Sequence, residues 1–210
     1  MRTLKRFTKY VNGFSKVNVT RSYGLLERFL AAQRAKVANR FISSKHRPGR
    51  ILDIGCSAYP IFLLTSKFVE KFGIDKTQCR ESGVLRRVKF VNYDIENGAK
   101  LPFDNSCIDV VTMLAVMEHI KFSILKYVIS EVYRVLKSGG VFIITIPSPW
   151  AEYILDIMAS LKLVSKIEME DHKSKLGNAK LLEILKAANF GTINFGYFEF
   201  FVNRWFVAKK

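Results

Sequence analysis

The sequence has few of the residues that build metal centres and covalent cross-links. Its three cysteines are odd in number and scattered, no Cys-x-x-Cys pair occurs, and no histidines lie near them at metal-ligand spacing. We therefore expect reduced thiols and no metal. No apolar run is long enough to span a bilayer, and residues 1–15 lack the continuous apolar core of a signal peptide. These absences favour a cytoplasmic protein, with peripheral attachment to a membrane left open.

Acidic residues are also scarce, with 18 Asp or Glu against 34 Lys or Arg and a formal net charge of +16. Most of the excess lies in residues 1–50, which hold thirteen basic residues and one acidic residue, Glu27. Clustered cations favour nucleic acid, an anionic membrane surface or a phosphorylated acceptor as partner, and a solvated tail is the alternative. We define residues 1–20 as a basic N-terminal arm. The oligomeric state is not predicted.

The remaining residues, 21–210, fit a single domain with one sizeable core. Its first apolar pattern, over residues 22–42, predicts an amphipathic helix that packs on a sheet, with contact to a membrane as the alternative. A second apolar stretch, over residues 148–175, is interpreted either as a lid over an acceptor pocket or as ordinary core.

Short apolar runs alternate with helical patterns after residue 49, which is typical of βαβ units. The predicted strands are 51–54, 69–74, 88–93, 108–114 and 141–146, and the predicted helices are 122–136, ended by Ser138-Gly139-Gly140, and 178–188. Two further β-rich runs, 193–202 and 205–208, are separated by Asn203 and Arg204, which predicts an antiparallel hairpin at the edge of the sheet. The fold is therefore predicted to be α/β, with a doubly wound, mostly parallel, seven-stranded Rossmann-like sheet.

The turn after the first strand is the expected ligand site, because doubly wound sheets bind ligands at the carboxyl ends of their strands. Gly55 lets backbone and ligand approach closely, and Pro60 suits the first turn of a helix whose amide groups attract an anion. Asp75 ends the second strand, where a carboxylate accepts hydrogen bonds from ribose. A dinucleotide needs Gly-x-Gly-x-x-Gly here, and this turn has one glycine, so S-adenosylmethionine fits better than NAD.

Four stretches in this order resemble the class I S-adenosylmethionine-dependent methyltransferases, in their methyltransferase type 11 branch. They are Ile-Leu-Asp-Ile-Gly-Cys (51–56), Gly-Ile-Asp (73–75), Asn-Tyr-Asp-Ile (92–95) followed by Leu-Pro-Phe-Asp (101–104), and residues 107–120 with 131–140. The resemblance implies the cofactor S-adenosyl-L-methionine. It implies that Asp53 and Gly55 border the methionine part, that Asp75 binds the ribose, and that Asp94 and Ile95 lie at the adenine. The backbone of Met113, Leu114 and Ala115 would meet the amino group, and Cys56, Ser57 and Lys76 are further expected cofactor-binding residues.

The family usually has further glycines at the positions of Ser57 and Tyr59. If position 57 needs a positive φ, serine there costs on the order of 1 kcal/mol against glycine.

Methyl transfer requires a base only when the acceptor is a neutral hydroxyl or an acidic carbon. Two histidines are candidates, His119 after the fourth strand and His172 in the stretch that precedes the last predicted helix; a structural role is the alternative for each.

The leading hypothesis is O- or C-methylation of a small molecule, a glycan or a lipid-linked acceptor. A nucleic-acid methyltransferase and a non-catalytic partner that binds S-adenosylmethionine are the alternatives. The fourth strand ends in Met-Leu-Ala, unlike the Asn/Asp-Pro-Pro-Tyr motif associated with methylation of base amines.

Overall fold

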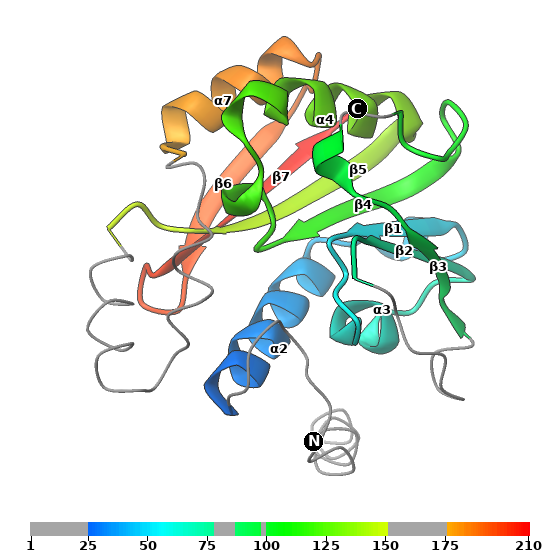
Figure 1. Ribbon diagram of the computed structural model, residues 1–210, viewed down its shortest axis with the longest axis horizontal. Coiled ribbons are helices and arrows are strands. Elements are labelled where there is room, and N and C mark those ends of the chain that lie inside the picture. The colour runs from blue at the N-terminus through cyan, green and yellow to red at the C-terminus, as the bar shows by residue number, and fades with distance from the viewer. Residues whose placement is uncertain (1–24, 78–86, 98–99, 151–175) are drawn as a thin grey trace.

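The computed structural model describes residues 25–77, 87–97, 100–150 and 176–210. Its centre is a seven-stranded sheet in the order β3-β2-β1-β4-β5-β7-β6 (Figure 1). The strands are β1 (Arg50–Ile54), β2 (Glu70–Asp75), β3 (Lys89–Asn92), β4 (Ile108–Leu114), β5 (Leu136–Pro147), β6 (Ile193–Phe198) and β7 (Asn203–Lys209). Strand β7 runs antiparallel to both β5 and β6, and the other pairs are parallel. The predicted doubly wound, mostly parallel sheet is confirmed.

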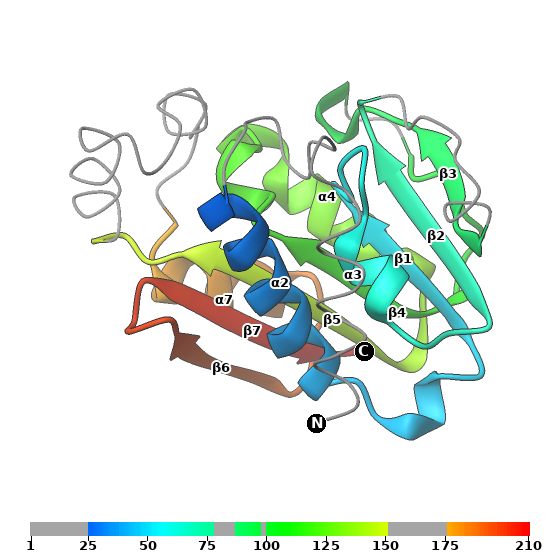
Figure 2. The ribbon, with the colours of Figure 1, turned by 90° about the horizontal axis from the view of Figure 1, so that it is seen from below.

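Helices cover both faces of the sheet (Figures 1 and 2). One face carries α2 (Leu25–Arg40) and α3 (Ile61–Thr65), and the other carries α4 (Phe122–Val135) and α7 (Asn178–Ala187). Because successive strand residues point to opposite faces, Ile51 joins the core on the α2 side while Leu52 and Ile54 join the core under α4 and α7. Ala35 and Ala38 bury the inner side of α2 in the first of these cores, so the expected packing of this helix is confirmed.

Three short 3-10 helices, η1 (Ser44–His46), η3 (Ile95–Asn97) and η4 (Met117–His119), complete the described elements. In the ranges that the structure covers, no helix is both long enough and apolar enough to cross a bilayer.

Helix α4 ends at Val135, within one residue of its predicted end, but the predicted terminator is wrong. Residues 138–140 do not terminate the helix, because α4 ends at Val135 and β5 begins at the next residue. The two glycines instead sit where the β4–β5 register shifts, and the Gly139 amide donates to the Lys210 carbonyl at 2.9 Å. A Cβ on Gly140 would lie 2.8 Å from the Lys137 carbonyl oxygen, so this irregularity in the strand requires a residue without a side chain.

The predicted turn of the terminal hairpin is also wrong. Asn203 and Arg204 are the first residues of β7, paired with Phe198 and Tyr197, and the chain reverses over residues 199–202. Asn203 and Arg204 are both buried, and the Arg204 guanidinium donates to the Pro147 and Leu176 carbonyls at 2.7 and 2.8 Å. Asn203 and Arg204 are polar, and the sequence therefore predicted a turn for them. Hydrogen bonds to distant carbonyls allow Arg204 to be buried in the strand instead.

Candidate cofactor site

A pocket with a cavity volume of about 70 Å³, open to solvent, lies at the carboxyl ends of the first strands. The chain passes from β1 outward to β2 and β3, then returns to β4 on the other side of β1, so the sheet reverses its order between β1 and β4. Crevices at such a reversal are the ligand sites of doubly wound sheets. The lining residues are Ile54, Gly55, Ile74, Asp75, Lys76, Tyr93, Asp94, Ile95, Glu96, Val116, His119 and Ile120.

The Asp75 carboxylate stands at the end of β2 and organises the loop after β1. Its Oδ2 accepts a hydrogen bond from the Ser57 amide at 2.8 Å, and its Oδ1 accepts one from the Thr77 amide at 2.7 Å. A carboxylate has about four acceptor positions, so these two amides leave capacity for two further donors. The geometry therefore fixes the carboxylate and leaves it able to bind a pair of hydroxyls.

Gly55 lies in the left-handed region with φ +72°, and its amide donates to the Ile74 carbonyl at 2.8 Å. A Cβ at this position would lie 2.4 Å from Cγ2 of Val116. The close neighbour of Gly55 is thus the Val116 side chain, which shares the pocket wall, and the close approach of a ligand to Gly55 stays a prediction.

Ser57 adopts φ +63°, the left-handed conformation in which glycine is favoured. Position 57 therefore does need a positive φ, and serine there costs on the order of 1 kcal/mol of stability relative to glycine. The Asp75 hydrogen bond to its amide offsets part of that cost.

Pro60 does not occupy the first helical position predicted for it. It is the N-cap of α3, and that helix has only five residues, 61–65. A helix of this length has a weak dipole, so its amide groups attract an anion only weakly.

Asp53 is buried beneath the pocket and does not line it. Burial raises the pKa of its carboxyl to about 7, the nearby charge of Asp75 adds to that rise, and a 2.6 Å hydrogen bond from Thr112 Oγ1 opposes it. This carboxyl therefore titrates near neutral pH.

The other predicted cofactor residues lie behind or beside the cavity wall. Cys56, Ser57, Met113, Leu114 and Ala115 are absent from the residues that line the pocket. Met113 is fully buried, while Ala115 has φ +56° and its amide donates to the Thr145 carbonyl at 2.9 Å. The predicted contact between the backbone of residues 113–115 and an amino group stays a prediction.

The pocket is acidic although the chain as a whole is strongly basic. Its ionisable lining comprises the carboxylates of Asp75, Asp94 and Glu96, against the single ammonium of Lys76 and the imidazole of His119. A concave site with this excess of negative charge attracts a cation and repels a pyrophosphate. The charge distribution thus supports the choice between a sulfonium nucleoside and a dinucleotide that the missing glycines first indicated.

Several lining residues were not predicted from the sequence. Tyr93 and Glu96 flank the predicted Asp94 and Ile95, so the third-strand motif marked their neighbourhood without naming them. Val116 and Ile120 follow β4. They are apolar, and the sequence alone does not distinguish an apolar residue in a pocket wall from one in the core.

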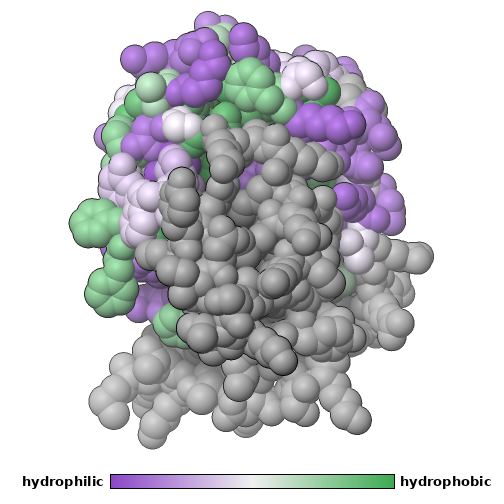
Figure 3. Space-filling view, turned by 60° about the vertical axis from the view of Figure 1, so that its left-hand side comes forward, coloured by the Kyte–Doolittle hydropathy of each residue, from purple (hydrophilic) through white to green (hydrophobic). Residues whose placement is uncertain are grey.

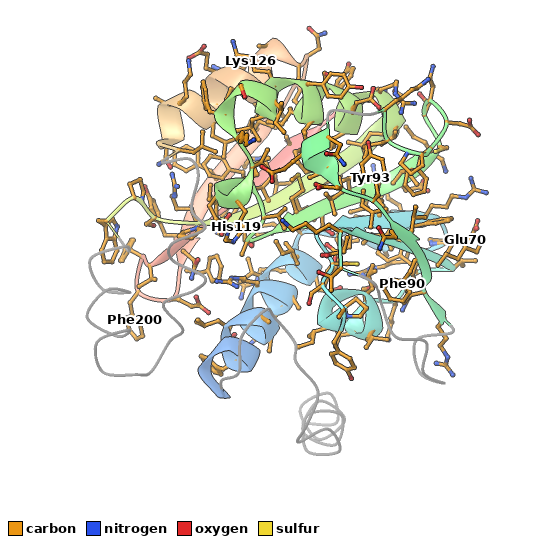
Figure 4. All side chains as sticks on the ribbon, viewed as in Figure 1. Glu70, Phe90, Tyr93, His119, Lys126 and Phe200 are labelled. Atoms are coloured by element: carbon orange, nitrogen blue, oxygen red, sulfur yellow. The ribbon has the colours of Figure 1, made fainter. Side chains whose placement is uncertain are left out.

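The two candidate bases have different outcomes. His119 is half-buried in η4 and lines the pocket, and Figure 4 labels it together with Tyr93. His172 lies outside the described residues, as do most of the predicted lid and the basic arm. Within the described part of the chain no group of three metal-binding side chains occurs, and neither Cys56 nor Cys107 forms a disulfide there.

Residues 52–144 match the profile of a family described as methyltransferase domain. Two curated relatives are similar over most of this chain. A probable S-adenosylmethionine-dependent methyltransferase of Mycolicibacterium smegmatis is 27% identical over 175 residues, covering 80% of this chain and 62% of the relative. The demethylmenaquinone methyltransferase of Symbiobacterium thermophilum is 29% identical over 161 residues, covering 70% and 60%. The chain therefore spans less than two thirds of the length of these relatives.

Among solved structures, a SAM-dependent methyltransferase from Archaeoglobus fulgidus superposes with a TM-score of 0.65 at 17% identity. The match covers 86% of this chain and 94% of the other. At this identity the likeness establishes the fold.

Proposed function

Because this chain belongs to the class I S-adenosylmethionine-dependent methyltransferase family, we propose that its pocket binds S-adenosylmethionine and that the protein transfers a methyl group to an acceptor. The observation that carries the proposal is the acidic pocket at the reversal of the sheet order, in a chain of net charge +16. The cofactor, when bound, supplies a methyl group on a positively charged sulfur that departs as a neutral thioether.

We assign binding roles to the residues that line the pocket. Asp75 would accept hydrogen bonds from the ribose hydroxyls while its two backbone partners hold it in place. Ile95 would pack against adenine, with Asp94 as an acceptor for the adenine amine. Gly55 would lie against the methionine part of the cofactor. It is the first residue of the loop after β1, whose Ser57 amide donates to Asp75.

His119 is proposed as the group that takes a proton from the acceptor. Its imidazole lines the same pocket, on the side formed after β4, and it is half-buried, which leaves it access to a ligand. A neutral imidazole accepts one proton near neutral pH and therefore suits a hydroxyl or an acidic carbon as the attacking group. Positioning supplies the rest of the rate, because an in-line displacement depends strongly on alignment.

The proposed acceptor is a small molecule, a glycan or a lipid-linked compound, methylated on oxygen or carbon. The apolar Val116 and Ile120 side chains form part of the pocket wall and favour a hydrophobic acceptor over a charged one. The relative from Symbiobacterium thermophilum is named for demethylmenaquinone, which agrees with this class. A nucleic-acid acceptor, suggested by the basic charge of residues 1–50, remains the second candidate.

Thermal-shift titrations test the cofactor assignment. S-adenosylmethionine and S-adenosylhomocysteine should raise the melting temperature, and NAD should not. Asp75→Ala should abolish the shift, whereas Asp104→Ala, an exposed aspartate outside the pocket, should leave it intact. Stabilisation by NAD alone would refute the proposal.

The role of His119 is tested separately from binding. His119→Gln should reduce turnover of a phenolic or quinol acceptor about 10²-fold or more, with little change in affinity for S-adenosylhomocysteine. If the variant instead loses affinity for S-adenosylhomocysteine but turns over the acceptor at the wild-type rate when saturated with cofactor, His119 is a cofactor-binding residue. His46→Gln, which changes a histidine outside the pocket, is the control.

A further inference from the structure

The four residues that join β6 to β7, 199–202, form what we call the aromatic turn. The Val202 amide donates to the Glu199 carbonyl at 3.0 Å and closes the turn, which places Phe200 and Phe201 at its tip. Phe200 is 96% exposed and Phe201 is 63% exposed. Figure 4 shows Phe200 directed away from the body of the protein, and Figure 3 shows hydrophobic residues projecting from this side of the molecule.

The backbone of the aromatic turn disfavours the residues that occupy it. Glu199, Phe200 and Phe201 have φ of 51°, 52° and 67°. A hairpin turn with positive φ at both central residues strongly prefers Asn-Gly, because bulky L-residues are strained there. Two phenylalanines therefore occupy strained positions without being buried in the core. Strain of this kind persists where a function retains the side chains.

Contacts within the protein hold the turn in this shape. Ser148, directly after β5, donates from Oγ to the Phe201 carbonyl at 2.6 Å and from its amide to the Val202 carbonyl at 2.8 Å. The Glu199 carboxylate accepts a hydrogen bond from Asn203 Nδ2. These hydrogen bonds tie the turn to the residue after β5 and to the start of β7, and so fix the position of the two rings.

Other exposed aromatic residues extend the apolar surface. Tyr197 is 42% exposed, and its ring centroid lies 5.5 Å from that of Phe201. Trp150 is 41% exposed and follows Ser148 by two residues. Tyrosine and tryptophan are the side chains enriched at the level of lipid headgroups.

A basic helix runs beside the aromatic turn. Helix α2 contains four Lys or Arg and one Glu, for a net charge of +3. Helix α2 crosses the sheet over β5 and β7 (Figure 2), and Phe41, the residue after the helix, has its ring centroid 4.3 Å from that of Trp205 in β7. Nearer its amino end, Arg34 lies close enough to the turn that its charge acts on Glu199. Lys36 and Arg40 are exposed on the same helix.

From these observations we propose that the aromatic turn and helix α2 together dock on an anionic lipid bilayer, with Phe200 and Phe201 inserted among the headgroups. Exposed rings flanked by cations match the two attractions that hold proteins at such a surface, burial of apolar area and the pull of acidic lipids. Single-stranded nucleic acid also stacks on aromatic rings, but its sites lie in a positive groove that follows the phosphates. This turn instead projects as a hydrocarbon tip whose two rings are exposed rather than set in a groove.

The docking surface lies at the same edge of the sheet as the cofactor pocket. Strand β6 is antiparallel to β7, and β7 is antiparallel to β5, so β6 runs in the same direction as β5 and β1. The aromatic turn follows the carboxyl end of β6 and therefore lies at the same edge of the sheet as the carboxyl end of β1. The carboxyl ends of β1 and β2 border the pocket. A docked protein would therefore hold its pocket close to the membrane, where a lipid-linked acceptor resides; this consequence rests on the proposed function, whereas the docking itself does not.

Co-sedimentation of the full chain with vesicles, without cofactor, tests the docking. The test variant is Phe200→Asn/Phe201→Gly, which installs the residues that this turn geometry favours. It should melt at a higher temperature than the wild type and partition about ten-fold or more less onto phosphatidylcholine vesicles containing phosphatidylserine. Val69→Ser, which removes an apolar residue 75% exposed just before β2, should partition like the wild type.

Three results would overturn the docking proposal. They are unchanged partitioning of the turn variant, equal partitioning of the wild type onto neutral and anionic vesicles, and loss of binding to single-stranded RNA in the turn variant with vesicle binding intact. Failure here is distinguishable from failure of the proposed function, because vesicle partitioning is measured without S-adenosylmethionine and the thermal shift without vesicles.

Discussion

Gly55→Ala is the substitution whose cost the structure specifies in most detail. The added Cβ would lie 2.4 Å from Cγ2 and 2.9 Å from Cγ1 of Val116, and the residue would keep φ +72°. The left-handed backbone costs about 1–2 kcal/mol for an L-residue. Forcing a methyl group into a filled space costs about 1–3 kcal/mol more. A combined loss of about 3 kcal/mol lowers the melting temperature of a chain of this length by about 6–12 °C.

Urea unfolding of a double-mutant cycle separates these two costs. In a Val116→Ala background the 2.4 and 2.9 Å clashes are removed and only a 3.3 Å contact with Cβ of residue 116 is left, so the backbone cost dominates and Gly55→Ala should then destabilise the fold by about 1–2 kcal/mol. Gly177→Ala is the matched control, because an added Cβ there meets nothing within 4 Å and its φ is −70°. Equal costs of Gly55→Ala in both backgrounds would refute the packing argument, and a cost below that of Gly177→Ala would refute both arguments.

Three further variants test the loop, the buried acid and the buried arginine. Ser57→Gly should raise the free energy of unfolding by up to about 1 kcal/mol, because its φ is +63°, and should preserve cofactor binding; a destabilised variant would contradict the strain. Burial raises the pKa of Asp53 from 3.8 to about 7, so the folded state binds this proton more tightly and the stability that the carboxyl contributes is lost as pH rises between about 4 and 7. Asp53→Asn should therefore gain stability relative to wild type across that window, by at most about 1.4 kcal/mol per pH unit, and parallel urea-unfolding profiles at pH 5, 6, 7 and 8 would contradict it. Arg204→Met should destabilise the fold by about 3 kcal/mol or more, since the Pro147 and Leu176 carbonyls would lose buried donors, and calorimetry showing a loss below 1 kcal/mol would contradict this role.

The parts of the fold predicted correctly from sequence are those in which periodicity and burial agree. Strand β4 was predicted at its observed bounds because five of its seven residues are buried and five of the seven are apolar. The start of α7 at Asn178 was also predicted correctly. In both cases local pattern and tertiary packing favour the same structure.

The errors arise where a local signal and the tertiary structure disagree. Phe200 and Phe201 have the composition of a strand, and only their positive φ reveals a turn. Ser138-Gly139-Gly140 has the composition of a helix end but lies at an irregularity in β5. Polar residues such as Arg204 enter a strand when distant carbonyls supply partners, and a linear pattern carries no information on those partners.

In the candidate site, too, the features that depend on local sequence were predicted, and those that depend on tertiary contacts were not. Asp75, Asp94 and Ile95 were predicted through motifs and do line the pocket. Val116 completes the wall only because Gly55 leaves space for its methyl groups, a contact between residues 61 positions apart in the chain. The acidic character of the pocket likewise depends on bringing Asp75 together with Asp94 and Glu96 in space, and the overall charge of +16 gives the opposite impression.

A crystal structure of the protein with S-adenosylhomocysteine tests the central claim most directly. We predict density in the pocket between β1 and β4, with both ribose hydroxyls within hydrogen-bond distance of the Asp75 carboxylate and adenine against Ile95. The amides of Ser57 and Thr77 should still donate to Asp75 in that complex. Ligand bound elsewhere on the chain, or a ribose that makes no contact with Asp75, would contradict the account.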